Sequence, residues 1–383
     1  MKVRLKELGE IITGNTPSKK IKEFWNSEDI YFIKPDIIED SGVNEISETK
    51  EYISEEARKK ARIVTKKSIF VTCIGSIGKI GIASAGEYAF NQQINAIVPN
   101  EKVQSKYLAY NLLYNKPRLV AMANAPVVPI INKRQFGEFI VNIETDIGRQ
   151  VKIVNVLDRL THIIRLSKQE LEKLDELIKA RFVEMFGDMI INPNGWGKVL
   201  LGEACDVRDG THDSPKYFTE GYPLVTSKNV TGGKIDFADC SLICEEDYNK
   251  INQRSKVDMG DILMPMIGTV GNPVIVDIEA EFAIKNVALI KFRENSTVIN
   301  SFVKALLESD YFDRAVISKV RGGTQKFISL GDIRKLEICL PPIAVQEQFS
   351  DFAKQVDKSK VAVQKALDET QTLFDSLMQE YFG

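Results

Sequence analysis

The chain contains 383 residues, of which 44% are hydrophobic and 27% are charged, and its formal net charge is −2. This composition is typical of a folded soluble protein rather than a disordered one, and the length leaves room for two domains of about 150 residues plus helices. No apolar run approaches the ~20 residues of a membrane span, and Met1–Arg4 leads into polar sequence rather than a signal peptide, so we expect a cytoplasmic protein. The charge argues against a strongly basic nucleic-acid coat but leaves locally basic DNA-binding surfaces open.

The first 146 residues mix short β-branched and aromatic runs, such as Ser68–Thr72, with glycine and asparagine turns and with helical stretches. Such a mixture predicts an α+β domain. The next segment, 147–187, is regular, because it lacks proline and its apolar residues recur at alternating steps of three and four. The apolar positions are Leu157, Leu160, Ile164, Leu171, Leu174, Ile178 and Met185, and the series is interrupted at Ser167 and Arg181. This spacing predicts a heptad helix of about 40 residues, roughly 60 Å long at ~1.5 Å per residue.

A second domain and a second helix follow. Pro193 and Gly195 end the first helix, so residues 188–342 are predicted to form another α+β domain. The last segment, 343–383, repeats the heptad pattern at Phe349, Phe352, Val356, Val363, Ala366, Leu373 and Leu377, with polar interruptions at Ser359, Thr370 and Glu380. We therefore predict four parts: 1–146, 147–187, 188–342 and 343–383. A helix this long needs a partner, and we expect the two helices to pair antiparallel as a coiled coil within the chain; the alternative is an ordinary dimerisation arm.

The two halves also align with one another. The aligned positions are Leu8-Gly9-Glu10 with Leu201-Gly202-Glu203, Gly75 and Gly78 with Gly268 and Gly271, Phe90 with Phe282, Gln150 with Gln348, and Phe186 with Phe382. Elements that recur in the same order predict an internal repeat with pseudo-twofold architecture. The expected fold class is therefore α+β, with two similar domains joined by two long antiparallel helices.

The residues offer little material for catalysis. The only histidines are His162 and His212, so neither a histidine-based triad nor a histidine-rich metal site is expected. The run from Gly75 to Ile80 has the wrong spacing for a phosphate-binding loop. Cys240 and Cys244 lie close in sequence but have no second cysteine or histidine pair nearby, so buried thiols are favoured over zinc. We predict a chain that is not an enzyme and binds neither cofactor nor metal.

One alternative is a metal-dependent nuclease. Pro35-Asp36 followed by Glu48-Thr49-Lys50 satisfies a loose pattern in which two carboxylates hold Mg²⁺ and the lysine stabilises charge at the phosphate. The pattern is short and common. The matching region of the second half, Thr226-Ser227-Lys228-Asn229, has no carboxylate.

Several motifs mark the domains and their boundaries. They are the two Leu-Gly-Glu triplets, the two Ile-Gly-x-x-Gly turns, Phe90-Asn91-Gln92-Gln93-Ile94-Asn95-Ala96, Leu340-Pro341-Pro342-Ile343-Ala344-Val345-Gln346-Glu347-Gln348, Phe186-Gly187-Asp188 before Asn192-Pro193-Asn194-Gly195-Trp196, and the closing Met378-Gln379-Glu380-Tyr381-Phe382-Gly383. In this order, and over essentially the whole length, the chain resembles the specificity (S) subunit of type I restriction-modification enzymes. It departs from a strict repeat where Ala283-Ile284-Lys285-Asn286 replaces the Asn-Gln-Gln run and where Asn142-Ile143-Glu144-Thr145-Asp146-Ile147 stands in place of the Pro-Pro pair.

The resemblance implies a function in DNA recognition. Each α+β domain is expected to be a target recognition domain that reads one half of a bipartite sequence in double-stranded DNA, and the helices are expected to fix the unread gap. The helices are also expected to dock two methylation (M) subunits, which bind S-adenosylmethionine and recruit ATP-dependent restriction (R) subunits. The chain itself would bind none of these cofactors. The second alternative is a coiled-coil adaptor with no role in DNA binding.

Candidate DNA-binding residues follow from the chemistry of base readout, in which Arg or Lys contacts guanine and Asn or Gln contacts adenine from loops or strand ends. In the first half they are Asn15, Thr16, Lys79, Gln92, Gln93, Lys133 and Arg134, and in the second they are Thr211, His212, Lys228, Asn229, Arg321, Thr324, Gln325 and Lys326. For the Gly-x-x-Gly turns the competing explanation is positive φ in a hairpin, and for the charged runs it is a solvated surface.

Overall fold

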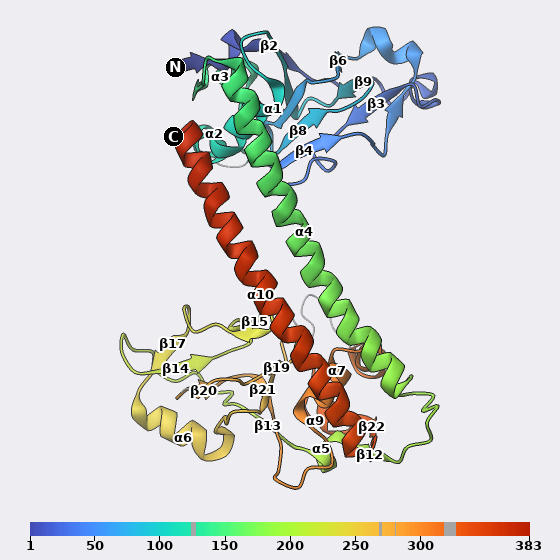
Figure 1. Cartoon of the computed structure of the whole chain (residues 1–383), viewed down its shortest axis with the longest axis vertical. Helices are drawn as coiled ribbons and strands as arrows, with labels where there is room; N and C mark the ends of the chain where they lie inside the picture. Colours follow the sequence, from blue (N-terminus) through green and yellow to red (C-terminus); the bar gives the residue numbers. More distant parts are fainter. Residues whose placement is uncertain (124–127, 268–269, 280, 318–326) are drawn as a thin grey trace. The chain divides into compact units, whose positions relative to one another are not determined.

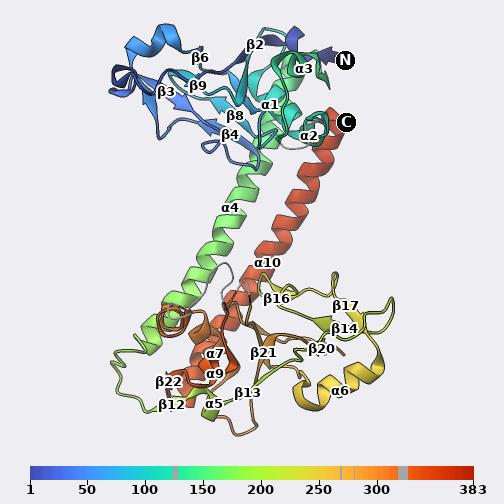
Figure 2. The same ribbon diagram turned by 180° about the vertical axis from the view of Figure 1, so that it is seen from behind.

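The chain divides into two compact units, each of which combines segments from distant parts of the sequence. The computed structural model describes residues 1–123, 128–267, 270–279, 281–317 and 327–383. Unit 1 comprises Met1–Lys168 and Lys365–Gly383, and unit 2 comprises Gln169–Gln364. The helices α4 (Ile147–Phe186) and α10 (Ile343–Phe382) each begin in one unit and end in the other (Figures 1 and 2). Because the division cuts both helices, the four-part division stays a prediction.

Unit 1 is built mainly from short strands. Its elements, with η marking a 3-10 helix, are β1 (Lys2–Arg4), η1 (Leu5–Glu7), β2 (Gly9–Thr13), η2 (Lys22–Trp25), β3 (Ile30–Ile33), β4 (Val43–Ile46), β5 (Tyr52–Ile53), η3 (Glu55–Lys60), β6 (Ile63–Thr65), β7 (Ile69–Thr72), β8 (Ile80–Ala83), β9 (Glu87–Phe90), β10 (Ile94–Pro99), α1 (Ser105–Tyr114), α2 (Lys116–Met122), α3 (Lys133–Glu138) and β11 (Ile140–Asn142). The strands form sheets of order β2-β10-β7-β8-β4, β5-β3-β9-β6 and β1-β11. The runs rich in isoleucine, valine and phenylalanine supply the buried strands, of which β7 and β8 are buried at every residue.

Unit 2 follows a similar order of elements, but among the described residues its two larger sheets each have one strand fewer than those of unit 1. Its elements are β12 (Lys198–Leu200), α5 (Leu201–Ala204), β13 (Asp206–Asp209), β14 (Tyr222–Val225), β15 (Val230–Thr231), β16 (Lys234–Ile235), β17 (Ser241–Ile243), α6 (Glu245–Ser255), β18 (Ile262–Pro265), β19 (Val274–Ile275), β20 (Ala283–Ile284), β21 (Val287–Lys291), α7 (Asn300–Leu307), α8 (Asp310–Ala315), α9 (Leu330–Arg334) and β22 (Glu337–Cys339). The sheets β13-β21-β18-β19, β17-β14-β20 and β12-β22 correspond to those of unit 1, and β15 pairs with β16. The predicted fold class, with its internal repeat, is confirmed.

Backbone hydrogen bonds correct the alignment at the start of each unit. The N–H of Leu5 donates to the carbonyl of Phe139, and the N–H of Leu201 donates to the carbonyl of Leu336. Leu201 therefore corresponds to Leu5, and the predicted match with Leu8 was wrong by three residues. The two Leu-Gly-Glu triplets are identical by chance. The backbone hydrogen bonds show which residues occupy equivalent positions in the two units.

A buried glutamine near the start of each long helix gives a second correction. Gln150 accepts from the N–H of Gln104 and donates to the carbonyls of Lys102 and Glu144. Gln346 repeats this arrangement: it accepts from the N–H of Ile299 and donates to the carbonyls of Thr297 and Pro341. The predicted counterpart of Gln150, Gln348, is instead exposed.

The two long helices run antiparallel within each unit. In unit 2 the rings of Phe182 and Phe186 lie 5.6 and 5.4 Å from the ring of Phe349, and Lys360 forms an ion pair with Asp175. In unit 1 the start of α4 and the end of α10 share one core, which contains Leu157 and Phe382. The prediction of an antiparallel pair within the chain is confirmed.

The heptad pattern was correct for α4 and partly wrong for α10. All seven predicted apolar positions of α4 are buried or half-buried, and so are the interruptions at Ser167 and Arg181. In α10 the pattern holds as far as Val363. Beyond it Leu367 and Phe374 lie inward, whereas the predicted Ala366 and Leu373 are exposed, and only Leu377 is half-buried as predicted. The step after Val363 is four residues rather than three, and it keeps the larger side chains inside. No helix in the described part of the chain carries the apolar stretch that a membrane span requires.

Candidate functional site

A tight turn follows the first long strand of each unit and positions a polar loop. The N–H of Gly14 donates to the carbonyl of Ile94, and that of Gly210 donates to the carbonyl of Val287. A Cβ on Gly14 would lie 2.1 Å from the carbonyl oxygen of Asn91, and one on Gly210 would lie 2.1 Å from that of Ile284. Both turns therefore require glycine, because a side chain would collide with the neighbouring backbone.

In unit 1 the turn leads into a contact between two exposed predicted residues. The hydroxyl of Thr16 donates to Oε1 of Gln92 over 2.9 Å. The neighbouring Asn15 has a structural role, because its amide donates to the carbonyl of Lys60 and accepts from the N–H of Arg62. Gln93 accepts through its side chain from Asn91. Thr16 and Gln92 thus present polar groups to solvent, while Asn15 ties the loop to the segment after η3.

In unit 2 the corresponding position holds His212. Its Nδ1 lies 2.8 Å from Oδ1 of Asn286, and its Nε2 lies 2.9 Å from Oδ2 of Asp209. The other carboxylate oxygen of Asp209 pairs with Arg254 from α6. The side chain of Asp209 is only 8% exposed, so this buried carboxylate orients an imidazole that is 63% exposed. The sequence prediction included His212 and missed Asn286, Asp209 and Arg254.

The strand connections explain why Asn286 was missed. The N–H of Asn91 donates to the carbonyl of Ile33, and the N–H of Lys285 donates to the carbonyl of Val225. Lys285 therefore corresponds to Asn91, and Asn286 to Gln92. The predicted match of Phe90 with Phe282 placed this run two residues out of register. In the corrected alignment the Asn-Gln-Gln run is not lost at this position, because the amide of Gln92 is replaced by the amide of Asn286.

A second loop lies between β3 and β4 in unit 1 and between β14 and β15 in unit 2. The N–H of Ile37 donates to the carbonyl of Lys34, and the N–H of Asn229 donates to that of Thr226. This match places Lys228 at the position of Asp36, and both are exposed. Asn229 is 5% exposed, and its side-chain oxygen accepts from both the N–H and the hydroxyl of Thr226. Among the predicted residues of this loop, Lys228 faces solvent and Asn229 holds the turn.

Of the remaining predicted residues, Thr211 joins the group in unit 2, because its carbonyl accepts from the N–H of Asn286. Lys79, Lys133 and Arg134 form no hydrogen bond with these pairs among the described residues. Lys79 is half-buried, and its ammonium lies 3.4 Å from the carbonyl of Pro35. Lys133 and Arg134 are exposed in the first turn of α3, after the capping residue Asn132. Four predicted residues lie outside the described part of the chain: Arg321, Thr324, Gln325 and Lys326.

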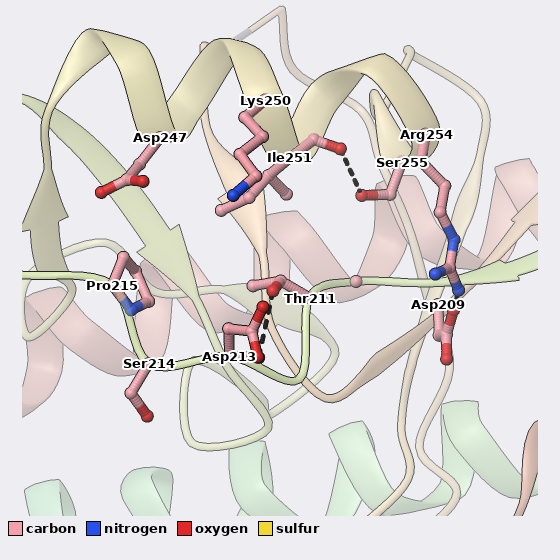
Figure 3. A pocket seen from close by; sticks show the side chains of 11 residues that line it. Asp209, Thr211, Asp213, Ser214, Pro215, Asp247, Lys250, Ile251, Arg254 and Ser255 are labelled. Atoms are coloured by element: carbon pink, nitrogen blue, oxygen red, sulfur yellow. Dashed lines mark hydrogen bonds and ion pairs between the residues drawn. The ribbon is translucent and has the colours of Figure 1, made fainter.

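A hollow of about 200 Å³ lies beside the loop of unit 2, between Gly210–Pro215 and α6. Figure 3 shows Lys250 and Arg254 extending from α6 toward the loop that carries Thr211 and Asp213. The N–H of Asp213 donates to the hydroxyl of Thr211, and this hydrogen bond holds the conformation of the loop. Acidic side chains (Asp209, Asp213 and Asp247) and basic ones (Lys250 and Arg254) both line the hollow, so it offers polar contacts of both kinds.

Comparison with known proteins identifies the family. A sequence model described as the type I restriction modification DNA specificity domain matches residues 1–176 and 193–370. The chain belongs to this family. A curated relative, the type I restriction enzyme MjaIX specificity subunit of Methanocaldococcus jannaschii, is 25% identical over 98% of this chain and 90% of its own length.

Solved structures support the fold of this specificity subunit. The S subunit of a type I restriction-modification system from M. genitalium is 15% identical, with a TM-score of 0.61 over 100% of this chain and 96% of its own. A chain from a study of complex assembly and conformational transition of the type I R-M system is 18% identical, with a TM-score of 0.57 over 100% and 97%. At these identities the likeness shows the fold alone.

Two buried cysteines of this specificity subunit are poor nucleophiles. Burial raises the pKa of the Cys73 and Cys205 thiols to about 12, which suits them to packing rather than nucleophilic attack. The residues of the nuclease pattern, Asp36, Glu48 and Lys50, are exposed, and no hydrogen bond or ion pair joins them to one another in the described part of the chain. The described residues contain no group of three acidic, histidine or cysteine side chains arranged to hold a metal ion.

Proposed function

We propose that this specificity subunit reads a bipartite target in double-stranded DNA, with unit 1 reading one half and unit 2 the other, and carries out no catalysis itself. The observation that carries the proposal is a shared framework with different exposed loops. Thr16 and His212, and Asp36 and Lys228, occupy matching positions with different chemistry, and Gln92 and Asn286 are amides of different length. Two related modules that read two different sequences need this combination, because a constant backbone presents variable side chains.

The candidate contacts divide into readers and backbone contacts. Amide side chains such as Gln92 suit base edges in the major groove, and exposed cations such as Lys133, Arg134 and Lys228 suit phosphates. Asn15 and Asn229 contribute by holding their loops, because their amides are engaged by backbone groups or a neighbouring hydroxyl. Arg321, Thr324, Gln325 and Lys326 remain part of the proposal as residues of a basic segment in the second half.

The long helices suit the docking of two methylation subunits. Apolar side chains are exposed along both, at Ile147, Val151, Val156, Ile163, Leu166, Leu177, Val183, Val361 and Leu373. A helix that faces water throughout does not expose so many large apolar side chains, whereas a protein interface covers them. Through the methylation subunits the chain would recruit restriction subunits. S-adenosylmethionine and ATP would bind to those partners.

We further propose that the helices set the length of the unread gap between the two half-sites. Each is a continuous helix of 40 residues that belongs to both units. Inserting seven residues, about two helical turns, into α4 after Lys168 and into α10 after Gln364 should lengthen the gap and leave both half-sites unchanged. Insertion of the same residues into the exposed loop at Gly232 is the control.

The test is single-molecule sequencing of N6-methyladenine in host DNA with and without this gene, in cells that express its methylation subunit. We expect one split motif, methylated on both strands around a fixed gap, that disappears with the gene. An unchanged methylome in cells that contain both subunits would contradict the proposal. Cleavage by the isolated chain with Mg²⁺, lost in Asp36→Ala, would favour the nuclease. The complex failing to retard any duplex would favour the adaptor.

A further inference from the structure

We propose that His212 and Asn286 act as one base-reading pair for the second half-site, and that Thr16 and Gln92 form the matching pair for the first. This inference rests on the proposed function and deepens it, because it assigns sequence preference to two side-chain contacts. Asn286 is absent from the residues that the sequence pattern selects.

The two pairs occupy the same place in the two units. Thr16 and His212 each stand two residues after the glycine turn, at Gly14 and Gly210. Gln92 and Asn286 each stand two residues after a short strand, β9 or β20, that pairs in parallel with β3 or β14. The side chains then meet over 2.9 Å in unit 1 and 2.8 Å in unit 2. The contact is therefore a feature of the repeat rather than of one loop.

Each contact orients an amide and leaves part of it available. Oε1 of Gln92 accepts from Thr16, and Oδ1 of Asn286 lies against His212. Within the described part of the chain, neither Nε2 of Gln92 nor Nδ2 of Asn286 donates a hydrogen bond. An oriented amide with a spare donor can meet N7 of a purine, and its oxygen keeps a second lone pair that can accept from N6 of adenine. The ligand that this site would recognise is the edge of a purine in the major groove.

The second pair is held more firmly than the first. Asp209 fixes the ring of His212, and Arg254 fixes Asp209. Lys285, beside Asn286, donates to the hydroxyl of Ser214 over 2.5 Å, which links the same two loops again. In unit 1 the partner of Gln92 is only a threonine hydroxyl. A more constrained pair should contribute more to binding of its base, because less side-chain freedom is lost on binding.

A backbone role competes with this assignment, and one substitution separates the two. Asn286 has φ of +54°, a left-handed conformation that asparagine tolerates and glycine adopts freely. Asn286→Gly therefore keeps the turn and removes the amide. If the residue served only the backbone, the variant would read the same DNA.

The experiment selects duplexes from a random library with the complex of the full chain and its methylation subunit. We expect Asn286→Gly and His212→Ala to lose a roughly tenfold preference at the same base pair of one half-site, with the other half unchanged. Gln92→Ala should do this in the opposite half, with a smaller loss. The matched controls Asn249→Ala and Asn26→Ala remove exposed amides elsewhere in units 2 and 1. Thermal melting and binding of the methylation subunit report that each variant is folded.

The outcomes separate the two levels of the proposal. If the wild-type complex selects a split motif and the Asn286→Gly and Gln92→Ala variants select the same motif, the pair assignment is overturned and the bipartite function stands. If His212→Ala and Asn286→Gly lose base preference at different base pairs, the two residues read DNA separately and the pair assignment is also overturned. No motif from the wild-type complex would overturn both. Loss of preference at a shared base pair, absent in the controls, would establish the pair.

Discussion

The two units share their hydrogen-bonded framework and differ where it meets solvent. Gln150 and Gln346 make the same three contacts, and Gly14 and Gly210 make the same close approach to a neighbouring strand. The segment after β5 or β17, by contrast, is a six-residue 3-10 helix in unit 1 and an eleven-residue α-helix in unit 2. A residue whose side chain hydrogen-bonds to backbone groups away from solvent cannot easily be replaced, because an unpaired buried group is costly. Residues in the exposed loops can vary.

The largest expected effect concerns the aromatic positions that repeat at the ends of the helices. Phe186 lies within 6.0 Å of the rings of Phe182, Trp196, Phe302 and Phe349. Phe186→Ala should destabilise unit 2 by about 3–5 kcal/mol, because it opens a cavity in a packed cluster. Phe382→Ala should cost unit 1 less, since the rings of Tyr107 and Tyr114 lie 5.2 and 6.3 Å from that of Phe382, a looser cluster than the one around Phe186. Thermal unfolding with hydrogen exchange resolved by unit measures both, and Val183→Ala at an exposed position of α4 is the control.

Next in size is the loss of a buried glutamine. Gln150→Ala and Gln346→Ala each remove three hydrogen bonds to part-buried backbone groups, so each should cost up to about 3 kcal/mol in its own unit. Equal losses would support the corrected alignment. Gln348→Ala, on the exposed side of α10, should change the unfolding midpoint little. A large effect at Gln348 together with a small one at Gln346 would restore the match made from the sequence.

The glycine turns test whether the framework positions the loops. Gly14→Ala and Gly210→Ala should each cost about 1–3 kcal/mol, because the added methyl group collides with a carbonyl oxygen. Each should also weaken recognition of one half-site and spare the other. Gly197→Ala is the control, since its Cβ would meet nothing within 4 Å. Unchanged melting and unchanged selection in both variants would show that the turns can open without cost.

A smaller effect is expected from the reversed charge at matching loop positions. Lys228→Ala should weaken DNA binding about tenfold or less and reduce the slope of log affinity against log salt by about one, if Lys228 contacts a phosphate. Asp36→Asn should strengthen binding slightly, because it removes a negative charge from the matching loop. Titration of the complex with duplex at several salt concentrations measures both slopes. Lys335→Ala, an exposed lysine outside the loops, should leave the slope unchanged.

The smallest effect is a pH dependence confined to unit 1. The hydrogen bond from Arg58 holds the pKa of Glu87 below its usual value of 4.5. A carboxylate with a lowered pKa stabilises the fold above its usual pKa, and this contribution is lost as pH falls through the lowered value. Arg58→Gln should therefore lower the melting point of unit 1 at neutral pH and converge with wild type in acid. Lys66→Gln is the control, and a difference that persists in acid would point to lost packing.

Much of the fold was predictable because it follows from periodicity. The heptad spacing of Leu157 to Met185 marks a helix whatever surrounds it. The helix ends at Phe186, where Gly187 takes a φ of +71°, rather than at the predicted Pro193 and Gly195. The family resemblance likewise followed from motifs in order. The alignment of Leu201 and Gln348 went wrong because short identical strings carry less information than the hydrogen bonds that place a residue. The buried position of Leu367 was missed because successive apolar positions of a heptad can be three or four residues apart. Only the packing of the helix determines which step occurs.

The candidate site was less predictable for a physical reason. Sequence alone determined the α+β class, the two helices, the repeat and the polar loops around Thr16, Gln92 and His212, because these depend on local composition and spacing. Only the tertiary structure brought His212 to Asn286 and to the buried Asp209, since the two loops are 74 residues apart in the chain at the first contact. It also showed that Asn15 and Asn229 serve the backbone. The partners of a polar side chain are decided by which strands pair, and strand pairing is a property of the whole fold.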